Sequence, residues 1–330
     1  MRIRATRADV AGAAGVSLST VSHVMNGRAA ELRIAPETVQ RVQAAAQHLH
    51  YIPRASARSF RYATSRTIGL LFSRVPKWNT MPVFQTVLLH AISHANECGY
   101  QVMPIPVPDL GIDDVPRFTA QIFGDVEIAG VVCEWFASSG LVGEWLSQAG
   151  VPLVWYSTSG IVTDTTQRAV SIEEEPGVND LLGNLQPRKT TVLLKGPGPN
   201  RGRYDVARKH FPGLVELDLA GWQQSDGIGI WDQLVTYADP LVICPNDPVA
   251  LGVMSAAQRS GRIAPRDLGI TGFGDSSTSQ LEMANLSTVG WPIAELGDRL
   301  ITEMMSMLGD GPTMAPPIVL TTTAMPRGSA

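Results

Sequence analysis

Cysteine and long apolar segments are both scarce in this sequence, and their scarcity excludes several classes of protein. The three cysteines, Cys98, Cys133 and Cys244, are far apart and form no CxxC pair, so they suit neither a disulfide framework nor a zinc site. Apolar runs such as Val151–Tyr156 are far shorter than the roughly 20 residues that a membrane-spanning helix needs. Residues 1–26 contain no apolar segment of the kind that a secretory signal has. We therefore expect a cytoplasmic protein with reduced cysteines and no membrane partner.

Motifs for catalysis, cofactors and metals are also missing. No GxSxG elbow, no nucleophilic Cys/His arrangement and no cluster of acidic ligands occurs. The segment Gly196–Gly202 follows a predicted strand, but its spacing is not GxGxxG and two prolines remove amides that a phosphate would need. His90 and His94 lie one helical turn apart, yet the glutamate of an HExxH motif is absent, so a solvated or core pair is favoured. The sequence therefore predicts no enzyme, no cofactor and no metal.

Charge is divided unevenly along the chain. The first 62 residues contain no lysine, but nine arginines against three acidic residues give them a net charge of +6. The other 268 residues hold 17 basic and 27 acidic side chains and carry −10, so the overall charge of −4 hides this division. At roughly 100 to 200 residues per domain, the 330 residues hold two or three domains. We predict a small module that binds a polyanion, joined to a larger body that does not.

Local signals in the basic segment predict three short helices. Thr6 and Asp9 suit a capping box, and Gly15 suits the left-handed conformation that ends a helix. Ser17 is a second N-cap, and Pro36 is favoured at the first position of a helix. The predicted helices cover residues 7–14, 18–25 and 36 to about 50. Only three residues separate the first two, which is the helix-turn-helix arrangement that presents its second helix to the major groove of DNA.

A longer string of residues carries a family resemblance. Asp9-Val10-Ala11, Gly15-Val16-Ser17, the segment Thr20–Gly27 and Tyr51-Ile52-Pro53 together closely resemble the N-terminus of the LacI/GalR family of bacterial transcriptional repressors. The resemblance continues to the C-terminus and covers nearly the whole chain. It implies a sequence-specific DNA-binding regulator that acts as a homodimer under the control of a small molecule.

The resemblance also assigns residues to the DNA. It places Leu18, Ser19 and His23 against base edges, and their chemistry agrees, since His23 can donate to a guanine acceptor and Leu18 can contact a thymine methyl. The loop Arg28–Arg33 is longer than the common family pattern, and we expect only added phosphate contacts from its two arginines. The phosphate contacts implied by the resemblance are Arg7, Thr20, Ser22 and Asn26.

Residues 54–61 resemble the hinge helix of the family, which forms on the operator and wedges a leucine into the minor groove. Phe60 stands at the position of that leucine, and Ala57 and Arg58 are expected beside it in the groove. An apolar wedge can unstack a base step and bend the duplex. The alternative for Phe60 is a linker aromatic that packs on the body.

The body, from Thr67 onward, alternates short apolar runs with helical stretches, which predicts parallel sheets covered by helices on both faces. The expected fold is α/β: a three-helix head with a hinge helix, then a periplasmic-binding-protein-like body of two doubly wound subdomains. The head covers 1–62 and the body 63–330. Within the body, we assign about 67–160 plus 291–325 to an N-subdomain and about 161–290 to a C-subdomain. The first strand series ends near residue 156, and the second begins with a strand near 169–172.

A cleft between two such sheets is a natural place for a small ligand. The resemblance is most specific over residues 240–252 and 261–289, and it assigns Asn246, Gly274 and Asp275 to an effector pocket with Arg203 and Trp222. Trp222 could instead be a plain core aromatic, and Arg203 an exposed helix residue. Gly274 and Ser157 stand where sugar-binding relatives of the family often have acids, so an anionic effector held by Arg74 and Arg203 becomes possible. The competing explanation is that glycine enlarges the pocket for an apolar ring on Trp222.

The function that the sequence supports is a repressor that binds a palindromic operator as a dimer and responds to a sugar or sugar acid. A solute-binding protein of a transport system, or an enzyme on the same fold, are the alternatives.

Overall fold

The computed structural model describes residues 6–25, 28–49, 65–73, 82–123, 126–135, 137–158, 160–162, 167–198, 201–309, 311–312 and 315–330. The chain divides into two compact units, residues 1–65 and 66–330, called here the head and the body. No helix within these ranges is both long and apolar enough to cross a bilayer.

The head consists of three helices, as predicted: α1 (Arg7–Ala14), α2 (Leu18–Met25) and α3 (Pro36–His48). The capping box is present, because the Asp9 amide donates to Thr6 Oγ1 at 3.3 Å and the Thr6 amide donates to Asp9 Oδ2 at 2.7 Å. Gly15 ends α1 in the left-handed region with φ of 66°. The buried side chains of the head core are valines and alanines, with Val10, Val21 and Val42 fully buried at its centre.

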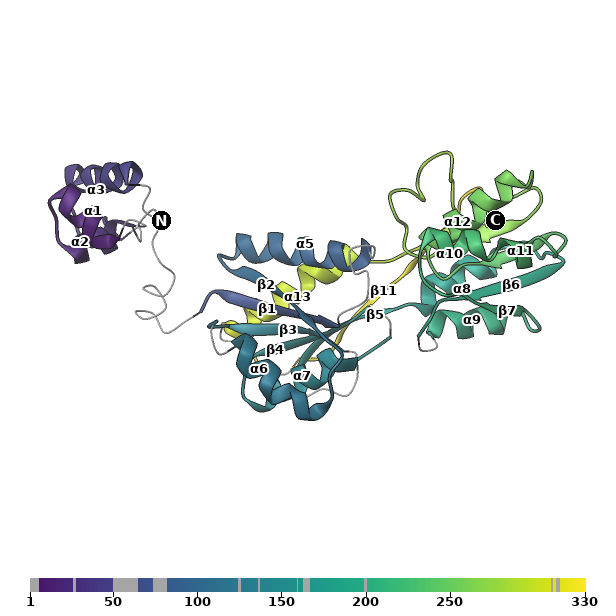
Figure 1. Cartoon of the computed structure of the whole chain (residues 1–330), viewed down its shortest axis with the longest axis horizontal. Coiled ribbons are helices and arrows are strands. Elements are labelled where there is room, and N and C mark those ends of the chain that lie inside the picture. Colours follow the sequence, from purple (N-terminus) through teal and green to yellow (C-terminus); the bar gives the residue numbers. More distant parts are fainter. Residues whose placement is uncertain are drawn as a thin grey trace. The chain divides into compact units, whose positions relative to one another are not determined.

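The first sheet of the body is parallel and has six strands in the order β11-β5-β4-β3-β1-β2. Figure 1 shows α5 and α13 on one face of this sheet and α6 and α7 on the other. The strands are β1 (Thr67–Ser73), β2 (Gln101–Val107), β3 (Gly130–Glu134), β4 (Leu153–Ser157), β5 (Arg168–Glu173) and β11 (Ile318–Thr321). The helices are α5 (Pro82–Glu97), η2 (Ile112–Asp114), α6 (Val115–Phe123), α7 (Ala137–Gln148) and α13 (Ile293–Leu308).

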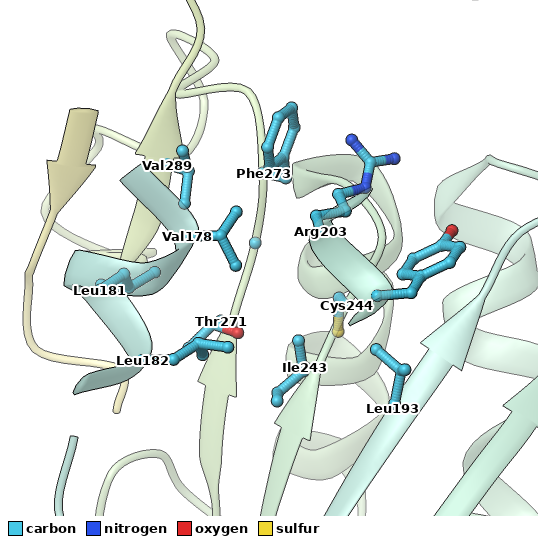
Figure 2. Close-up of a pocket in the computed structure, with 12 residues that line it drawn as sticks. Val178, Leu181, Leu182, Leu193, Arg203, Ile243, Cys244, Thr271, Phe273 and Val289 are labelled. Atoms are coloured by element: carbon cyan, nitrogen blue, oxygen red, sulfur yellow. The ribbon is translucent and has the colours of Figure 1, made fainter. Parts of the chain in front are cut away.

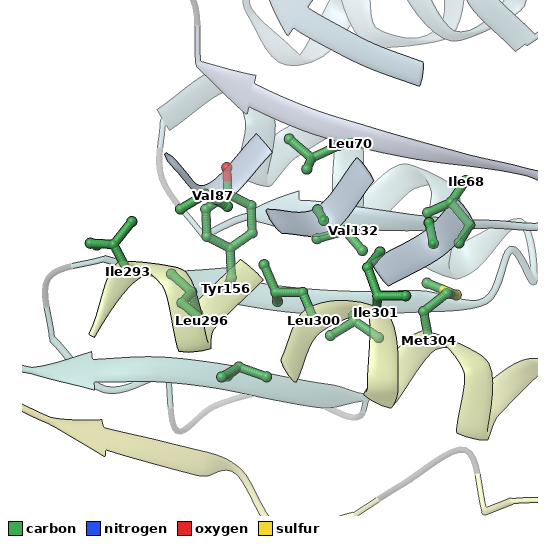
Figure 3. Close-up of a cluster of buried hydrophobic side chains, with 14 of the residues drawn as sticks. Ile68, Leu70, Val87, Val132, Tyr156, Ile293, Leu296, Leu300, Ile301 and Met304 are labelled. Atoms are coloured by element: carbon green, nitrogen blue, oxygen red, sulfur yellow. The ribbon is translucent and has the colours of Figure 1, made fainter. Parts of the chain in front are cut away.

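The larger core of this sheet lies under α5 and α13. Figure 3 shows Leu296, Leu300 and Met304 of α13 directed at the strands, where they meet Val132 and Tyr156. All five side chains are less than 2% exposed. The spacing of four residues along α13 puts its apolar side chains on one face, so the helix covers the sheet along its length.

The second sheet is also parallel and has four strands in the order β7-β6-β8-β9. Its strands are β6 (Thr190–Lys195), β7 (Val215–Asp218), β8 (Pro240–Ile243) and β9 (Gly269–Thr271). Its helices are α8 (Glu175–Gly183), α9 (Gly202–His210), α10 (Gln224–Gly229), α11 (Trp231–Leu234) and α12 (Asp247–Arg259). An antiparallel ribbon of β10 (Thr288–Gly290) and β12 (Thr323–Met325) adjoins it. Two wound α/β halves are therefore confirmed.

One strand assignment was wrong. We predicted the strand near 169–172 as the first of the second series, but β5 pairs with β4 and β11 and belongs to the first sheet. The cause is that β5 is buried over nearly its whole length, which is typical of a parallel strand but does not identify the sheet that contains it. The chain passes to the second sheet only after β5.

Three described segments connect the two sheets: Glu174 after β5, residues 291–292 before α13, and Thr322 between β11 and β12. In Figure 1, β5 and β11 run side by side toward the second sheet. The Thr322 hydroxyl joins two of these segments, since it donates to the Glu174 carbonyl at 2.8 Å and accepts from the Gly177 amide at 3.1 Å. The crossing region is thus tied together by hydrogen bonds.

Candidate functional site

The outer face of α2 is the candidate DNA-binding surface of the head. Leu18 is 52% exposed, Ser19 is exposed and His23 is half-buried, while Val21 and Val24 are buried against α1 and α3. The helix is therefore amphipathic, and the three predicted base-contacting side chains lie outside its core.

Hydroxyl groups gather at the start of α2. Ser17 Oγ accepts from the Thr20 amide at 3.1 Å and lies 2.7 Å from Ser19 Oγ and 2.9 Å from Thr20 Oγ1. These groups and the exposed backbone of a helix N-terminus suit a phosphate oxygen.

The other predicted DNA contacts differ in accessibility. Arg7 is half-buried at the start of α1. Ser22 is only 7% exposed, which makes it the least accessible of the predicted phosphate contacts that the structure describes. Arg28 forms a two-bond ion pair with Glu31, at 2.5 and 2.8 Å, so its charge is partly neutralised within the loop. The predicted contacts Asn26, Ala57, Arg58 and Phe60 lie outside the described residues.

In the body, two of the predicted effector residues are held together. Asn246 is the N-cap of α12, with its Oδ1 accepting from the Val249 amide at 2.9 Å, and its Nδ2 donates to the Trp222 carbonyl at 2.9 Å. The Trp222 ring lies against Gly196, where a Cβ would come within 2.6 Å of it. Asn246 is thus bonded to the backbone of Trp222, and the Trp222 ring packs against the glycine that follows β6.

The remaining predicted residues occupy varied positions. Ser157 is half-buried at the end of β4, and Arg74 lies outside the described residues. Gly274 has φ of 133°, a conformation that L side chains rarely adopt, which explains why glycine occupies this position. Asp275 is paired with Arg327 at 2.5 Å, and both side chains are 17% exposed. Its charge is therefore neutralised by the C-terminal segment.

Arg203 is buried rather than exposed, so the alternative of a solvated helix residue is wrong. Its Nη1 donates to Glu174 Oε1 at 3.1 Å, and its guanidinium carbon lies 4.2 Å from the centre of the Phe273 ring. The two side chains of the ion pair are 7% and 2% exposed. Arg203 therefore joins α9 to the segment that crosses between the sheets.

A second arginine, which the sequence interpretation missed, lies in the same place. Arg201 Nη1 is 3.8 Å from Glu174 Oε1, and its guanidinium carbon is 5.0 Å from the centre of the Trp222 ring. Burial lowers the pKa of Arg201, and the positive charge of Arg203 lowers it further. The negative charges of Glu174 and, most weakly, of Glu134 at the end of β3 raise the pKa of Arg201, but they do not offset this lowering.

Trp291 completes this group. It lies in the second crossing segment, and its ring packs edge-on against Phe273, with 5.1 Å between the ring centres. We call Glu174, Arg201, Arg203 and Trp291 the crossing cluster. Among its members only Arg203 was named from the sequence. No local pattern marked the other three; Glu174, for example, lies within an acidic run that resembles an ordinary solvated surface.

A small cavity lies on the C-subdomain side of Arg203, between α8 and the second sheet. Figure 2 shows the guanidinium of Arg203 near Phe273 at one end and Leu182 and Ile243 at the other. Its lining is mostly apolar: Val178, Leu181, Leu182, Leu193, Arg203, Tyr204, Ile243, Cys244, Thr271, Gly272, Phe273 and Val289. The cavity is part of the subdomain core and offers few polar groups to a sugar.

Metal and disulfide chemistry find no support in the part of the chain that the structure describes. No group of three or more His, Cys, Asp or Glu side chains is close enough there to hold a metal ion. All three cysteines are free thiols, and burial raises the pKa of Cys133 and Cys244, which keeps both protonated.

Comparisons with known proteins agree with this architecture. Residues 6–54 match the family described as bacterial regulatory proteins, lacI family, and residues 194–330 match a periplasmic binding protein-like domain. The chain is 28% identical to the ribose operon repressor of Bacillus subtilis, with 98% of each chain covered. It is 24% identical to the ribose operon repressor of Haemophilus influenzae, with 92% of each covered.

Solved structures show the same fold. The Lac repressor dimer bound to operator and the anti-inducer ONPF matches with a TM-score of 0.79 at 21% identity, with 99% of each chain covered. The complex of the transcriptional regulator CelR with cellobiose matches with a TM-score of 0.66 at 22% identity and 99% coverage of this chain and all of the other. The relatives named here are repressors and regulators rather than enzymes, as the sequence predicted for this chain. The chain thus contains a lacI-family regulatory domain at residues 6–54 and a periplasmic binding protein-like domain at residues 194–330, on the fold of the Lac repressor.

Proposed function

We propose that this protein is a transcriptional repressor that binds a near-palindromic operator as a homodimer in the cytoplasm. The observation that carries the proposal is the α2 face, where Leu18, Ser19 and His23 project from a buried valine core in a segment of net charge +6. One such head contacts a single major groove, so specificity requires a second copy on a symmetric site. The relatives named above are repressors, and one solved neighbour is a dimer on its operator.

The test begins with selection of bound duplexes from a random library by the full-length protein. We expect the selected sites to be near-palindromes bound by two chains, with affinity that falls as salt rises by a log-log slope of about −0.9 per neutralised phosphate. An asymmetric site occupied by one chain, or binding that salt leaves unchanged, would contradict the proposal.

The hinge residues supply a further arm of this proposal. We assign Phe60 as a minor-groove wedge, with Ala57 and Arg58 beside it in the groove. Phe60→Ala should then reduce both the affinity for the selected site and the bend angle measured by fluorescence energy transfer across the duplex. An unaltered bend angle would contradict the wedge and favour the alternative, in which Phe60 is a linker aromatic that packs on the body.

For the body, we propose that a sugar or sugar acid binds between the two sheets and changes the affinity for the operator through one coupling free energy. The assigned contacts are Arg203, Trp222, Asn246, Ser157, Gly274 and Asp275, together with Arg74, which lies outside the described residues. The support is the bond of Arg203 to Glu174, in a segment that joins the sheets, and the position of Trp222 under Arg201, the second arginine beside Glu174. Release or tightening of the selected duplex on addition of a bound sugar would establish the coupling. If every ligand that the body binds leaves duplex affinity unaltered, the coupling is absent.

A further inference from the structure

The crossing cluster concentrates the unpaired buried polar atoms of the molecule. Within the described residues, six buried side-chain nitrogen or oxygen atoms have no hydrogen-bond partner, and four of them belong to this cluster. These four are Glu174 Oε2, Arg201 Nε, Arg203 Nε and Trp291 Nε1. Buried polar atoms in proteins almost always have a partner. The concentration of such atoms around the Glu174 ion pairs, with Trp291 linked to Arg203 through the Phe273 ring, therefore points to a polar ligand that completes their hydrogen bonds.

The charge of the cluster is unbalanced. Two guanidinium groups share a single carboxylate oxygen, at 3.1 Å from Arg203 and 3.8 Å from Arg201. Burial and mutual repulsion lower the pKa of Arg201, which means that Glu174 does not fully compensate the two cations. A buried guanidinium is strongly stabilised by an oxyanion that it can contact through two N–H groups.

Two other acids near the strand ends of the second sheet, Asp275 and Asp247, are engaged elsewhere. Asp275 pairs with Arg327 at 2.5 Å. Asp247 accepts from the Thr288 hydroxyl at 2.6 Å and from the Ser276 amide at 2.7 Å. Their bonds hold them in the loop and ribbon, so they are not arranged to balance Arg201. Glu134 of the first sheet reaches Arg201 only as the weakest of the influences on its pKa.

The unpaired atoms also specify hydrogen-bond types. Three of them, on Arg201, Arg203 and Trp291, are donors that require acceptors, and one, on Glu174, is an acceptor that requires a donor. A neutral polyol satisfies such a set poorly, because it provides no charge to offset the second guanidinium. An oxyanion with a hydroxyl nearby provides both: its oxygens accept from the donors and its hydroxyl donates to Glu174.

We propose that the crossing cluster selects an effector that carries an oxyanion and a hydroxyl donor, with Arg201 and Arg203 binding the oxyanion and Glu174 accepting from the hydroxyl. The inference rests on the proposed function, which puts an effector between the sheets. It replaces Arg74 by Arg201 as the second cation and adds Glu174 and Trp291, neither of which the family resemblance had suggested. The oxyanion can be a carboxylate, as in a sugar acid, or a phosphate, as in a sugar phosphate.

Calorimetry on the full-length protein tests this with matched probes. The panel pairs gluconate, galactonate, glucuronate, galacturonate and glucose 6-phosphate with the neutral parent sugars glucose and galactose. At least one acid or phosphate should bind ten or more times more tightly than its parent sugar. Preference for the carboxylates or for glucose 6-phosphate identifies the source of the oxyanion. Equal or tighter binding of the neutral partner throughout, or no binding of any anion, would overturn the proposal.

Two substitutions give effects of opposite sign on binding of a bare oxyanion, inorganic phosphate. The Arg201 side chain is 24% exposed and only loosely paired, so the Arg201→Gln variant should fold. This variant should bind phosphate and the preferred anion at least ten times more weakly than the parent protein. Glu174→Gln removes the competing carboxylate and should strengthen phosphate binding while weakening the hydroxylated anion. If Arg201→Gln and Glu174→Gln each lost binding of phosphate and of the preferred anion, with melting temperatures unaltered, the assigned roles would be contradicted.

The matched control is Arg208→Gln. Arg208 lies on the same helix as Arg203, but its guanidinium pairs with Glu216 at 2.8 Å and Asp205 at 2.7 Å, away from the cluster. Anion affinity should be the same as in the parent protein. Binding of the selected duplex is measured alongside: a protein that binds duplex and responds only to neutral sugars refutes this inference alone, whereas failure to select any duplex refutes the proposed function.

Discussion

The head and the body differ in the range of the interactions that place their polar side chains. In the head, Thr6 pairs with Asp9, Ser17 with Thr20, and Arg28 with Glu31, each over three positions. In the body, Glu174 meets Arg203 across 29 positions, and Asp275 meets Arg327 across 52. The surface of the head is thus fixed by local structure, whereas the crossing cluster exists only after the two sheets have formed.

The two regions also differ in what is buried. The head core is made of valines and alanines, such as Val10 and Ala14, whereas leucine, isoleucine and tyrosine fill the body. A head with small core side chains loses little apolar area when one is truncated, and its stability depends relatively more on caps and turns. The body should tolerate loss of a cap but not loss of a central leucine.

The largest effect is expected from Leu300→Ala in the body. Leu300 is fully buried between α13 and the first sheet (Figure 3), so the substitution should lower the free energy of unfolding of the body by about 2 to 5 kcal/mol. All seven tryptophans follow residue 65, so tryptophan fluorescence in urea reports on the body alone.

The control for this substitution is Leu89→Ala on α5, where the side chain is 65% exposed. We expect a change within about 0.5 kcal/mol. If Leu300→Ala were equally mild, or if it also removed the protection of head amides from hydrogen exchange, the picture of a leucine core confined to the body would be wrong.

The next effect concerns DNA recognition by the head. His23→Ala should lower affinity for the selected duplex by about 1 to 3 kcal/mol and leave binding to random duplex nearly unchanged, because base contacts specify and phosphate contacts position. Fluorescence anisotropy at fixed salt measures both. His48→Ala, an exposed histidine in the last turn of α3, is the matched control and should alter neither. Equal losses on both duplexes would reassign His23 to phosphate binding.

The sequence predicted most of the fold because its signals are local. The capping box at Thr6, the left-handed Gly15 and the proline at the start of α3 each fixed a helix boundary in the head. The alternation of apolar strands and helices predicted both sheets of the body. The exception is β5, which was assigned to the wrong sheet. The sequence of a buried strand does not show which strands it pairs with, and only the pairing with β4 shows that β5 belongs to the first sheet.

The ligand site was predicted less completely, for the same physical reason. Arg203 and Trp222 were named from the family resemblance: Arg203 belongs to the crossing cluster, and the Trp222 ring contacts Arg201 of that cluster. Glu174, Arg201 and Trp291 were missed because each is ordinary in its own sequence context. Their burial arises when α9 packs against the crossing segments, an event that one-dimensional patterns do not encode.

A smaller effect tests the dependence of the head on its caps. Thr6→Ala removes the hydroxyl that accepts from the Asp9 amide and should destabilise α1 by about 1 kcal/mol. Hydrogen exchange of the α1 amides measures the change, and body fluorescence in urea should be unaltered. Gln40→Ala, at an exposed position within α3, provides the comparison and should have no such effect. A loss of protection in both variants would mean that the cap is not the cause.

The smallest effect tests whether surface ion pairs of the body matter beside its core. Glu216 accepts from Arg208 Nε at 2.8 Å and lies 3.0 Å from Lys195 Nζ, and these partners lower the pKa of its carboxyl to about 2. A lowered pKa stabilises the folded chain above the ordinary value near 4.5, and the stabilisation is lost as the pH falls through the folded value. Because Glu216 is 31% exposed, solvent screening limits the contribution to roughly 1 kcal/mol or less. Glu216→Gln should therefore lower stability slightly and constantly between pH 7 and 5, and the difference from the parent protein should shrink below pH 4.5 and vanish near pH 2. Urea titrations followed by tryptophan fluorescence, with the exposed Glu282→Gln as control, resolve this trend. A difference that grows on acidification would show that the carboxyl is destabilised by its surroundings instead.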